Sequence, residues 1–371
     1  MAFFLKQKVS VGPGYLCLGL LLAALATMNL ACRTERKPAT VVPTVAAPEM
    51  VYLVPYMENR KWGFIDTTGA VVIPARWNSA GPFSEGRAII KSEGKWGYVD
   101  RHGEEVIPPQ YDKARPFSDG MASVKQNGKY GYVDAGGKLV IPPQYPKTLG
   151  EFSEGLAAVP NDSGLWGYID RTGAQVIPAQ FVRAGKFSSG CAPVRIGDRY
   201  GFINRQGKLL GEPDFVYTDR YVNGLAMVRV GTPPNVRWGF ADATGKVRFT
   251  LEADEAKAMS EGLARVRVGQ KWGYVNTKGK SAVPAEYDFA FDFKEGLAPV
   301  RQGHGWGYVS PTGKMVIAPQ YLVAEAFRNG LAYVTFKGGW GYINKSGKMV
   351  WKTEALAQAG GEGEGEKEED D

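Results

Sequence analysis

An aromatic residue followed directly by Gly recurs nine times in this chain, and this repeat limits the fold more than any other feature. Six of the eight intervals between successive copies are 34 residues, and the other two are 36 and 38 residues. A period of this length is typical of stacked supersecondary units, so we expect one tandem array rather than several unrelated domains. The nine pairs are Trp62-Gly63, Trp96-Gly97, Tyr130-Gly131, Trp166-Gly167, Tyr200-Gly201, Trp238-Gly239, Trp272-Gly273, Trp306-Gly307 and Trp340-Gly341.

Each pair begins a segment such as KWGYVD, in which a second aromatic residue follows two positions after the first. In a β-strand, side chains two positions apart point to the same face, so this segment predicts a strand with one aromatic face. The Gly between the aromatic residues removes a side chain where a neighbouring strand or ring must approach closely. We therefore interpret the pairs as core packing between units rather than as ligand contacts.

A turn is predicted directly after this strand. Asp or Asn usually follows, as at Asp66, and a Gly comes three positions later, as at Gly69. An Asx side chain can cap such a turn, and Gly can take its left-handed position. Regularly spaced Asp residues can also bind calcium, but the calcium-type glycine pattern is missing and Asn or Ser replaces Asp in several copies. We predict a turn, and no metal.

A second strand follows the turn, clearest at Val106–Tyr111, Val140–Tyr145 and Val176–Phe181. Its Pro, twelve residues after the Trp, predicts a sheet edge or a strand end. A loop then leads to a Phe-Ser-Glu-Gly-Leu-Ala motif that opens a third strand. Three short strands are too few to bury their own face, so neighbouring units must stack.

The fold class predicted is therefore all-β, with nine three-stranded antiparallel units in an open superhelix or a propeller-like ring. We favour the open form, because three strands are few for a propeller blade. The sixth unit departs from the pattern over residues 246–257, which lack the Pro and the strand-ending aromatic residue. That departure is consistent with a bend, a disrupted blade or a specialised site.

The aromatic residues that end the second strand are the candidate binding residues. Repeated aromatic rings can stack on sugars, but they can also pack between units, and the sequence favours neither role for this set. The candidates are Trp77, Tyr111, Tyr145, Tyr287 and Tyr321.

The amino terminus predicts export. Residues 1–31 combine Lys6 and Lys8 with a short apolar core and small residues near its end, as in a signal peptide. Residues 30–32, Leu-Ala-Cys, look like the end of a bacterial lipobox, which would make Cys32 a lipidation site. The alternative is ordinary cleavage near residue 26, which gives a soluble periplasmic or secreted protein. Residues 32–49 are rich in Pro, Thr and Ala, a composition that suits a flexible tether and favours the anchored form.

The charge distribution and the reactive residue types limit the partners and activities that the sequence predicts. The net charge of +7 includes an acidic tail within residues 354–371, which we expect to be disordered, and the basic residues before it are scattered through the repeats of residues 50–353. That scatter argues against nucleic acid as a partner. His102 and His304 lie in or beside turns without metal-ligand neighbours, and Cys191 stands alone in the repeats as a small buried hydrophobe. We predict no catalytic residues, no cofactor and no enzyme activity.

The segment KWGYVDRHGEEVIPPQYDKARPFSDGMA and its copies resemble the WG-repeat family of bacterial proteins, from residue 51 to about residue 352. The resemblance implies an all-β repeat scaffold, usually exported or surface-associated, and supplies no catalytic residues. We therefore expect a membrane-anchored lipoprotein of the cell envelope that binds an envelope or extracellular protein. The alternative is a protein that binds glycan or peptidoglycan of the cell wall.

Overall fold

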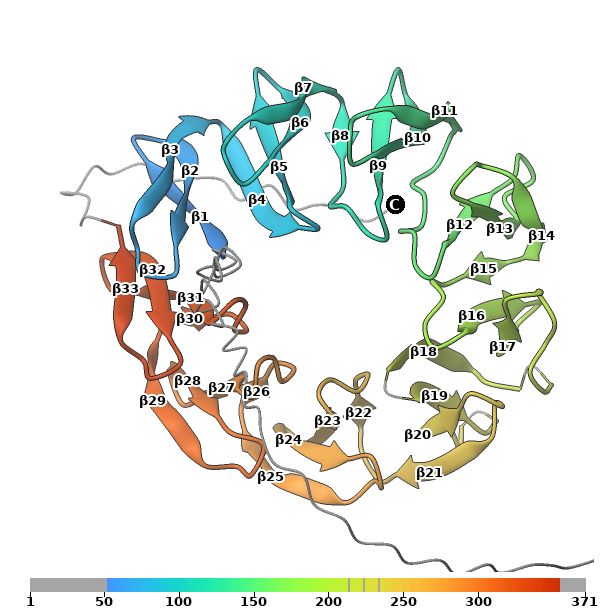
Figure 1. Cartoon of the computed structure of the whole chain (residues 1–371). Helices are drawn as coiled ribbons and strands as arrows, with labels where there is room; N and C mark the ends of the chain where they lie inside the picture. The colour runs from blue at the N-terminus through green and yellow to red at the C-terminus, as the bar shows by residue number, and fades with distance from the viewer. Residues whose placement is uncertain (1–51, 213, 223, 233, 354–371) are drawn as a thin grey trace, which may run out of the picture. The chain divides into compact units, whose positions relative to one another are not determined.

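The computed structural model describes residues 52–353 except residues 213, 223 and 233. The chain divides into two units, residues 1–49 and residues 50–371, and the described residues all lie in the second unit. Its described regular structure consists of nine small antiparallel sheets that follow one another along the chain. Figure 1 shows these sheets arranged as blades around a ring. We number them blade 1 to blade 9 in chain order.

Every blade comes from one continuous segment of the chain. Blade 1 contains β1 (Leu53–Glu58), β2 (Lys61–Asp66) and β3 (Val71–Trp77). Blade 2 contains β4 (Ser79–Ser84), β5 (Arg87–Ser92), β6 (Lys95–Val99) and β7 (Glu105–Tyr111). Blade 3 contains β8 (Lys113–Ala114), β9 (Met121–Gln126), β10 (Lys129–Asp134) and β11 (Leu139–Tyr145). Blade 4 contains β12 (Leu156–Pro160), β13 (Trp166–Asp170) and β14 (Gln175–Phe181).

The second half of the ring follows the same order. Blade 5 contains β15 (Arg183–Ala184), β16 (Cys191–Ile196) and β17 (Arg199–Asn204). Blade 6 contains β18 (Tyr217–Val222), β19 (Leu225–Val230), β20 (Arg237–Asp242) and β21 (Val247–Leu251). Blade 7 contains β22 (Glu255–Ala256), β23 (Leu263–Val268), β24 (Lys271–Asn276) and β25 (Ser281–Tyr287). Blade 8 contains β26 (Phe289–Ala290), β27 (Ala298–Gln302), β28 (Gly305–Val309) and β29 (Met315–Tyr321). Blade 9 contains β30 (Val323–Ala324), β31 (Leu331–Phe336), β32 (Gly339–Asn344) and β33 (Met349–Lys352).

Six blades have four strands, where the sequence predicted three. The additional strand is the innermost one, and in blades 3, 7, 8 and 9 it is only two residues long. In blade 3 it pairs Lys113 with Lys125 and Ala114 with Val124. Two residues are too few to show a period of two, which is why the sequence indicated a loop there.

The outermost strand explains the Gly of each repeat. In blade 7, Trp272 pairs with Tyr287 and Tyr274 pairs with Val283, so the outer strand places extra residues over Gly273 and bulges. A Cβ atom added to Gly273 would lie 2.6 Å from the backbone nitrogen of Ala285, closer than real Cβ atoms come. The predicted close approach of a neighbouring strand is confirmed. The outer strand is also the sheet edge that its Pro predicted.

The Asx turn after each of these strands is confirmed as well. In blade 1 the Asp66 carboxylate accepts hydrogen bonds from the backbone N–H of Thr68 at 2.8 Å and of Ala70 at 3.0 Å. Gly69 ends the turn with a φ of 92°, a left-handed value that favours Gly. The hydrogen bond from the Thr68 hydroxyl is the main cause that holds the pKa of Asp66 below its usual range.

The hydrophobic core lies between neighbouring blades rather than within each one. In blade 2 the second aromatic residue, Tyr98, is fully buried, and its ring lies 4.8 Å from that of Phe117 in the segment that leads into β9 of blade 3. The Tyr98 hydroxyl also donates a hydrogen bond to the carbonyl of Arg115 at 2.7 Å. Stacking therefore buries the face that one blade cannot bury alone, as the sequence predicted.

The Phe-Ser-Glu-Gly motif adds two polar links between blades. The Ser118 hydroxyl donates to the carbonyl of Phe152 at 2.8 Å, one repeat further along the chain. The Glu85 carboxylate accepts from the backbone N–H groups of Asp119 at 2.7 Å and Gly120 at 2.8 Å. Where the motif carries Ser and Glu, these side chains therefore connect one turn to the next around the ring.

The ring closes between blade 9 and blade 1, so the open form favoured from the sequence is wrong. The Tyr342 hydroxyl donates to the carbonyl of Pro55 at 2.9 Å, across 287 positions of the chain. The rings of Trp62 and Trp340 stack with centroids 6.1 Å apart. Because each end blade comes from one segment, side chains make this closure, and neither sheet receives a strand from the other end. The fold is a nine-bladed β-propeller.

The irregular part of the ring is not the sixth unit of the sequence. Its outer strand β21 is formed, with the buried Leu251 opposite Trp238 in place of an aromatic residue. The departures lie in the two blades before it and at its inner edge. Blade 4 lacks the short inner strand, and the outer segment of blade 5 pairs only through isolated bridges, Tyr200 to Phe215 and Ile203 to Leu209. The inner strand β18 of blade 6 is six residues long, as is β4 of blade 2, whereas the inner strand of blade 5 has two residues.

Candidate functional site

The strand-ending aromatic residues lie mostly in the core. Trp77, Tyr111, Tyr287 and Tyr321 are buried, and Tyr145 is half-buried. Burial leaves the four buried side chains little surface for a ligand, so we assign them a packing role.

The first aromatic residue of each repeat is more exposed than the core interpretation requires. Tyr130, Trp272 and Trp306 are buried, whereas the other six are half-buried. The fully buried rings belong instead to the second aromatic position, as at Phe64 and Tyr168. The Trp-Gly and Tyr-Gly pairs therefore supply repeated, partly exposed aromatic surface, in addition to exposed single residues such as Tyr217.

A basic residue lies directly across the sheet from most of these aromatic residues. Lys91 faces Trp96 with its ammonium 5.2 Å from the ring centroid, and Arg229 faces Trp238 with its guanidinium at 5.0 Å. Blades 3 and 5 repeat the arrangement, and blades 7 and 8 carry Arg at the same position. The remaining pairs are Lys125 with Tyr130, Arg195 with Tyr200, Arg267 with Trp272 and Arg301 with Trp306.

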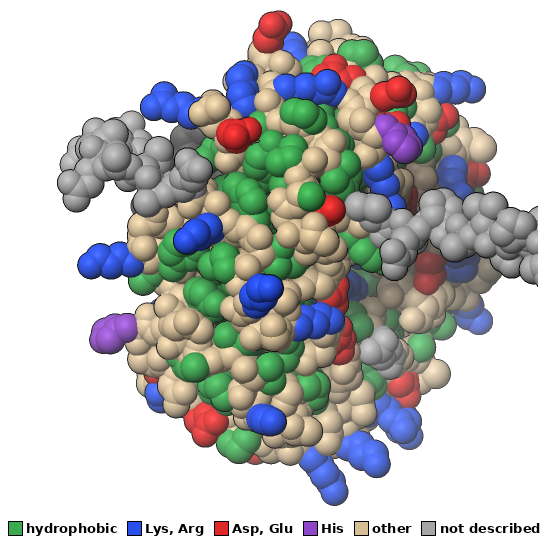
Figure 2. All heavy atoms as spheres, turned by 60° about the vertical axis from the view of Figure 1, so that its left-hand side comes forward, with side chains coloured by type: hydrophobic (Ala, Val, Ile, Leu, Met, Phe, Trp, Pro, Cys, Tyr) green, Lys and Arg blue, Asp and Glu red, His purple; other side chains and the backbone are tan. Residues whose placement is uncertain are grey.

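Because the blades share one design, these six pairs lie at the same end of equivalent strands and on one face of the ring. We call this the cation–aromatic face. The sequence indicated only a scatter of basic residues, and Figure 2 shows Lys and Arg side chains projecting singly from the side of the ring. The grouping becomes visible only when strand pairing places residues of successive repeats on the same face.

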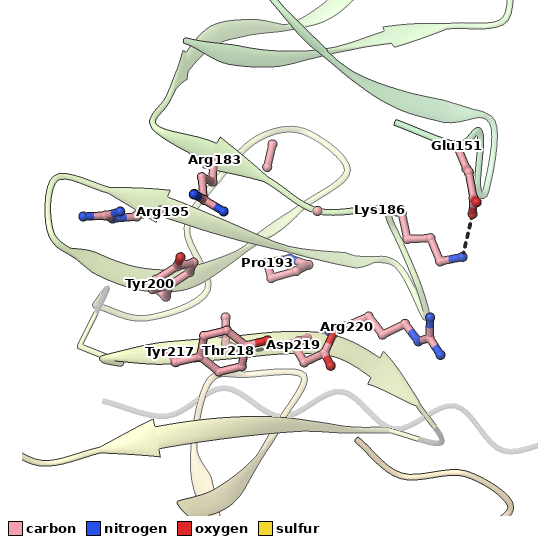
Figure 3. Close-up of a pocket in the computed structure, with 12 residues that line it drawn as sticks. Glu151, Arg183, Lys186, Pro193, Arg195, Tyr200, Tyr217, Thr218, Asp219 and Arg220 are labelled. Atoms are coloured by element: carbon pink, nitrogen blue, oxygen red, sulfur yellow. Dashed lines mark hydrogen bonds and ion pairs between the residues drawn. The ribbon is translucent and has the colours of Figure 1, made fainter. Parts of the chain in front are cut away.

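A cleft of about 410 Å³ lies between blades 5 and 6, in the irregular part of the ring. Figure 3 shows Arg183 and Arg195 toward one end of it and Lys186 and Arg220 toward the other. Its remaining lining includes Glu151, Ala184, Gly185, Pro193, Tyr200, Tyr217, Thr218 and Asp219.

An aromatic strip borders this cleft. The ring of Tyr217 lies 5.9 Å from that of Tyr200 and 6.3 Å from that of Trp238, and Tyr217 is 38% exposed. The Arg195 guanidinium lies over the Tyr200 ring at 5.8 Å. The site therefore combines aromatic surface with positive charge, which suits an anionic ligand that has an apolar face.

The two His residues and Cys191 do not line this cleft. His102 and His304 are exposed in turns, as the sequence predicted. Cys191 is buried, and burial raises the pKa of its thiol, which keeps it in the unreactive protonated form. Over residues 52–353, apart from the three not described, no group of His, Cys, Asp and Glu has the geometry of a metal site.

Several predictions fall on residues that the structure does not describe: the export signal, Cys32, the tether and the acidic tail. For the described part of the chain, no helix long and apolar enough to cross a membrane is present.

The family model for the WG containing repeat matches this chain eight times in succession between residues 62 and 339. The chain belongs to this family. The matched copies each begin at the aromatic residue of an aromatic-Gly pair, and they are 62–96, 96–130, 130–162, 166–200, 200–231, 238–272, 272–303 and 306–339. In this WG-repeat protein each copy therefore begins within one blade and ends in the next.

One of the solved structures found to be similar supports the fold. A crystal structure of a eukaryotic initiation factor is similar with a TM-score of 0.60 and 11% identity, over 82% of this chain and 96% of that chain. The dihydro-heme d1 dehydrogenase NirN in complex with DHE is similar with a TM-score of 0.45 and 9% identity, over 81% of this chain and 72% of that chain. At these identities the likeness concerns the fold alone. No curated protein matches the sequence.

Proposed function

We propose that this WG-repeat protein is a scaffold without enzymatic activity, which binds another protein of the cell envelope through its cation–aromatic face. The observation that carries the proposal is the same pair of residue types at equivalent positions in six blades, with the aromatic ring partly exposed in blades 2, 5 and 6. Propellers commonly bind proteins, and a face that repeats one contact around a ring suits a partner that touches several blades at once.

The chemistry of this face supports binding. Trp, Tyr and Arg are the residues most often found at energetic hot spots of protein interfaces, because they combine large contact area with directional polar groups. Here the half-buried Trp96 and Trp238 offer ring edges while Lys91 and Arg229 stand over the rings. A positive face steers an acidic partner and fixes its orientation. We therefore propose that the partner presents acidic side chains.

Lipidation of Cys32 would tether the propeller to a membrane through residues 32–49, and would place the face within reach of other envelope components. The export signal and the composition of the tether support this location. Exposed His residues and a buried Cys support the absence of catalysis.

A glycan ligand is the second candidate function. The exposed Tyr217 beside the basic groups of the cleft favours it, because sugars present both apolar ring faces and polar edges.

The test is a pull-down with residues 50–371, which form one compact unit. The bait is offered solubilised envelope proteins and, separately, isolated cell-wall sacculi. The scaffold proposal expects one protein in stoichiometric amount, lost on the double substitution Lys91→Glu and Lys125→Glu. The matched control is Lys278→Glu with Lys280→Glu, at the turn on the opposite end of the same type of strand.

Equal recovery with both double variants would refute docking on the cation–aromatic face. Saturable retention on sacculi that free sugars compete away, without a stoichiometric protein, would favour the glycan function instead.

A further inference from the structure

We propose that the cleft between blades 5 and 6 is a binding site for a carboxylate-bearing saccharide. This inference deepens the second candidate function, because it names the ligand class and the residues that bind it. It does not depend on protein docking, since the residues that test docking, Lys91 and Lys125, lie in other blades.

At the junction between blades 7 and 8, the corresponding space is filled by long side chains. There the Arg265 guanidinium forms an ion pair with Asp292 at 2.9 Å, and it also lies 5.7 Å from the ring centroid of Phe291. The Phe291 ring in turn stacks on Trp306 with centroids 5.1 Å apart. Long side chains of both blades therefore occupy the junction.

At the junction between blades 5 and 6, residues of different size and charge occupy these positions. Pro193 and Arg265 occupy equivalent positions, since each lies two residues after the first residue of its strand. Those first residues are Cys191 and Leu263. Arg220 replaces Asp292, so the ion pair that closes the other junction cannot form here. Gly185 packs closely on Pro193, since a Cβ at that position would lie 2.6 Å from the Pro193 ring. The space that the Arg265–Asp292 pair fills between blades 7 and 8 is therefore left open between blades 5 and 6.

The pairing of charged residues at the cleft also differs from that in blade 7. Arg183 lies directly across the sheet from Arg195, whereas the equivalent pair in blade 7 is Glu255 with Arg267, an ion pair with a 3.4 Å separation. Like charges directly opposite each other on neighbouring strands are unfavourable. An anion placed between Arg183 and Arg195 removes that repulsion, and guanidinium groups bind carboxylates with paired hydrogen bonds.

The opposite end of the cleft carries a second pair of cations. Figure 3 shows Lys186 and Arg220 there, with the Lys186 ammonium 3.2 Å from Glu151. Positive charge at both ends fits a ligand with more than one carboxylate. Asp219 and Glu151 supply acceptors for hydroxyl groups, which a saccharide has in abundance and a plain polyanion lacks.

The aromatic surface of the cleft indicates that the ligand has an apolar face, as a sugar ring does. The exposed ring of Tyr217, with Tyr200 and Pro193, gives the apolar platform on which a sugar ring can lie. A neighbouring hollow between blades 4 and 5 is lined by Lys147 and the half-buried Trp166, and it shares Arg183 with the cleft. A chain of several acidic sugar units can therefore contact both hollows with Arg183 between them.

The experiment is calorimetric titration of residues 50–371 with a galacturonic acid trimer. We expect saturable binding, weaker by roughly tenfold or more in Arg183→Ala and in Arg220→Ala, because each removes a charge-assisted contact. Both side chains are exposed, so thermal melting curves should stay unchanged. The control Arg301→Ala, at the position equivalent to Arg195 in blade 8, should bind like the unaltered protein.

Two further ligands and one further variant test the chemistry of the site. A galactose trimer should bind far more weakly, and equal binding would overturn the role of the carboxylates. A triglutamate peptide should also bind more weakly, and equal binding would show that charge alone acts and refute the saccharide assignment. Tyr217→Ala should weaken binding of the acidic trimer, and an unchanged affinity would remove the aromatic platform from the proposal. Absence of binding by the acidic trimer would overturn the site itself, while leaving the protein-docking test unaffected.

Discussion

Burial differs among residues that occupy the same sequence position, and this difference makes a quantitative prediction. Trp272 is 5% exposed, and its ring packs against Phe289 at 5.7 Å, with the Arg265 guanidinium at 5.4 Å. Trp166 begins an equivalent strand but is half-buried and lines the hollow between blades 4 and 5. Trp272→Ala should therefore destabilise the propeller much more than Trp166→Ala.

The magnitude follows from the contacts removed. Replacement of a buried Trp by Ala typically costs about 3–5 kcal/mol, through lost burial and the cavity left behind. The cation–π contact with Arg265 adds about 1 kcal/mol at a partly exposed site. For Trp166 the lost burial is smaller, so we expect at most about half of the Trp272 effect.

The assay is equilibrium unfolding in urea, with far-ultraviolet circular dichroism as the signal, so that loss of a Trp does not alter the readout. A lower transition midpoint at unchanged slope reports lost stability. Equal midpoint shifts for the two variants would refute the argument that burial, rather than the repeat position, sets the contribution of each Trp. A native midpoint for Trp272→Ala would show that this aromatic residue does not hold the blades together.

Three further predictions test the blade design. Gly273→Ala should lower the free energy of unfolding by at least about 1–3 kcal/mol, because the new methyl group overlaps the backbone nitrogen of Ala285. Urea unfolding measures the change. An unchanged free energy of unfolding would show that the bulge is not what requires Gly. Ser260→Ala removes the 2.7 Å hydrogen bond to the carbonyl of Phe293 in the next blade and should cost about 1–3 kcal/mol in the same assay; an unchanged midpoint would count against the polar link. Burial raises the pKa of Tyr287 to about 12, so the folded protein holds this proton where the unfolded chain, with a pKa of about 10, releases it. That part of the stability should be complete below about pH 10 and fall as the pH rises toward 12. The check is urea unfolding at pH 8 to 12 of the unaltered protein and of Tyr287→Phe; the same loss of stability with pH in both would contradict it.

Much of each blade was predictable, because its determinants are local. The aromatic alternation of KWGYVD, the Asx turn at residues 66–69 and the Pro in the outer strand each act within a few residues. The predicted role of Gly also held, since it depends on one strand crossing its immediate neighbour.

Ring closure was not predictable, because it depends on contacts between distant segments. The stacking of Trp62 on Trp340 requires the blade-to-blade angle to add up to a full turn, and no local pattern reports that angle. The two-residue inner strands also escaped detection, and without them a blade looked too thin for a propeller.

The candidate site was hidden for a different reason. Lys91 and Arg229 look like isolated charges in the sequence, and only strand pairing sets each of them opposite an aromatic ring. The cleft likewise depends on comparing Pro193 and Arg220 with the residues that fill the same junction two blades later. The aromatic residues singled out from the sequence, such as Trp77, are large and periodic because they pack the core.

The closure by side chains has a consequence for how the protein is made. Each blade uses one continuous stretch of chain, so it can pair all of its strands as soon as that stretch has left the ribosome. Only the seam between Pro55 and Tyr342 must wait for the end of synthesis. During translation the growing chain is thus an arc whose two end blades each expose an unfinished apolar face, and release of the last blade joins them in a single step.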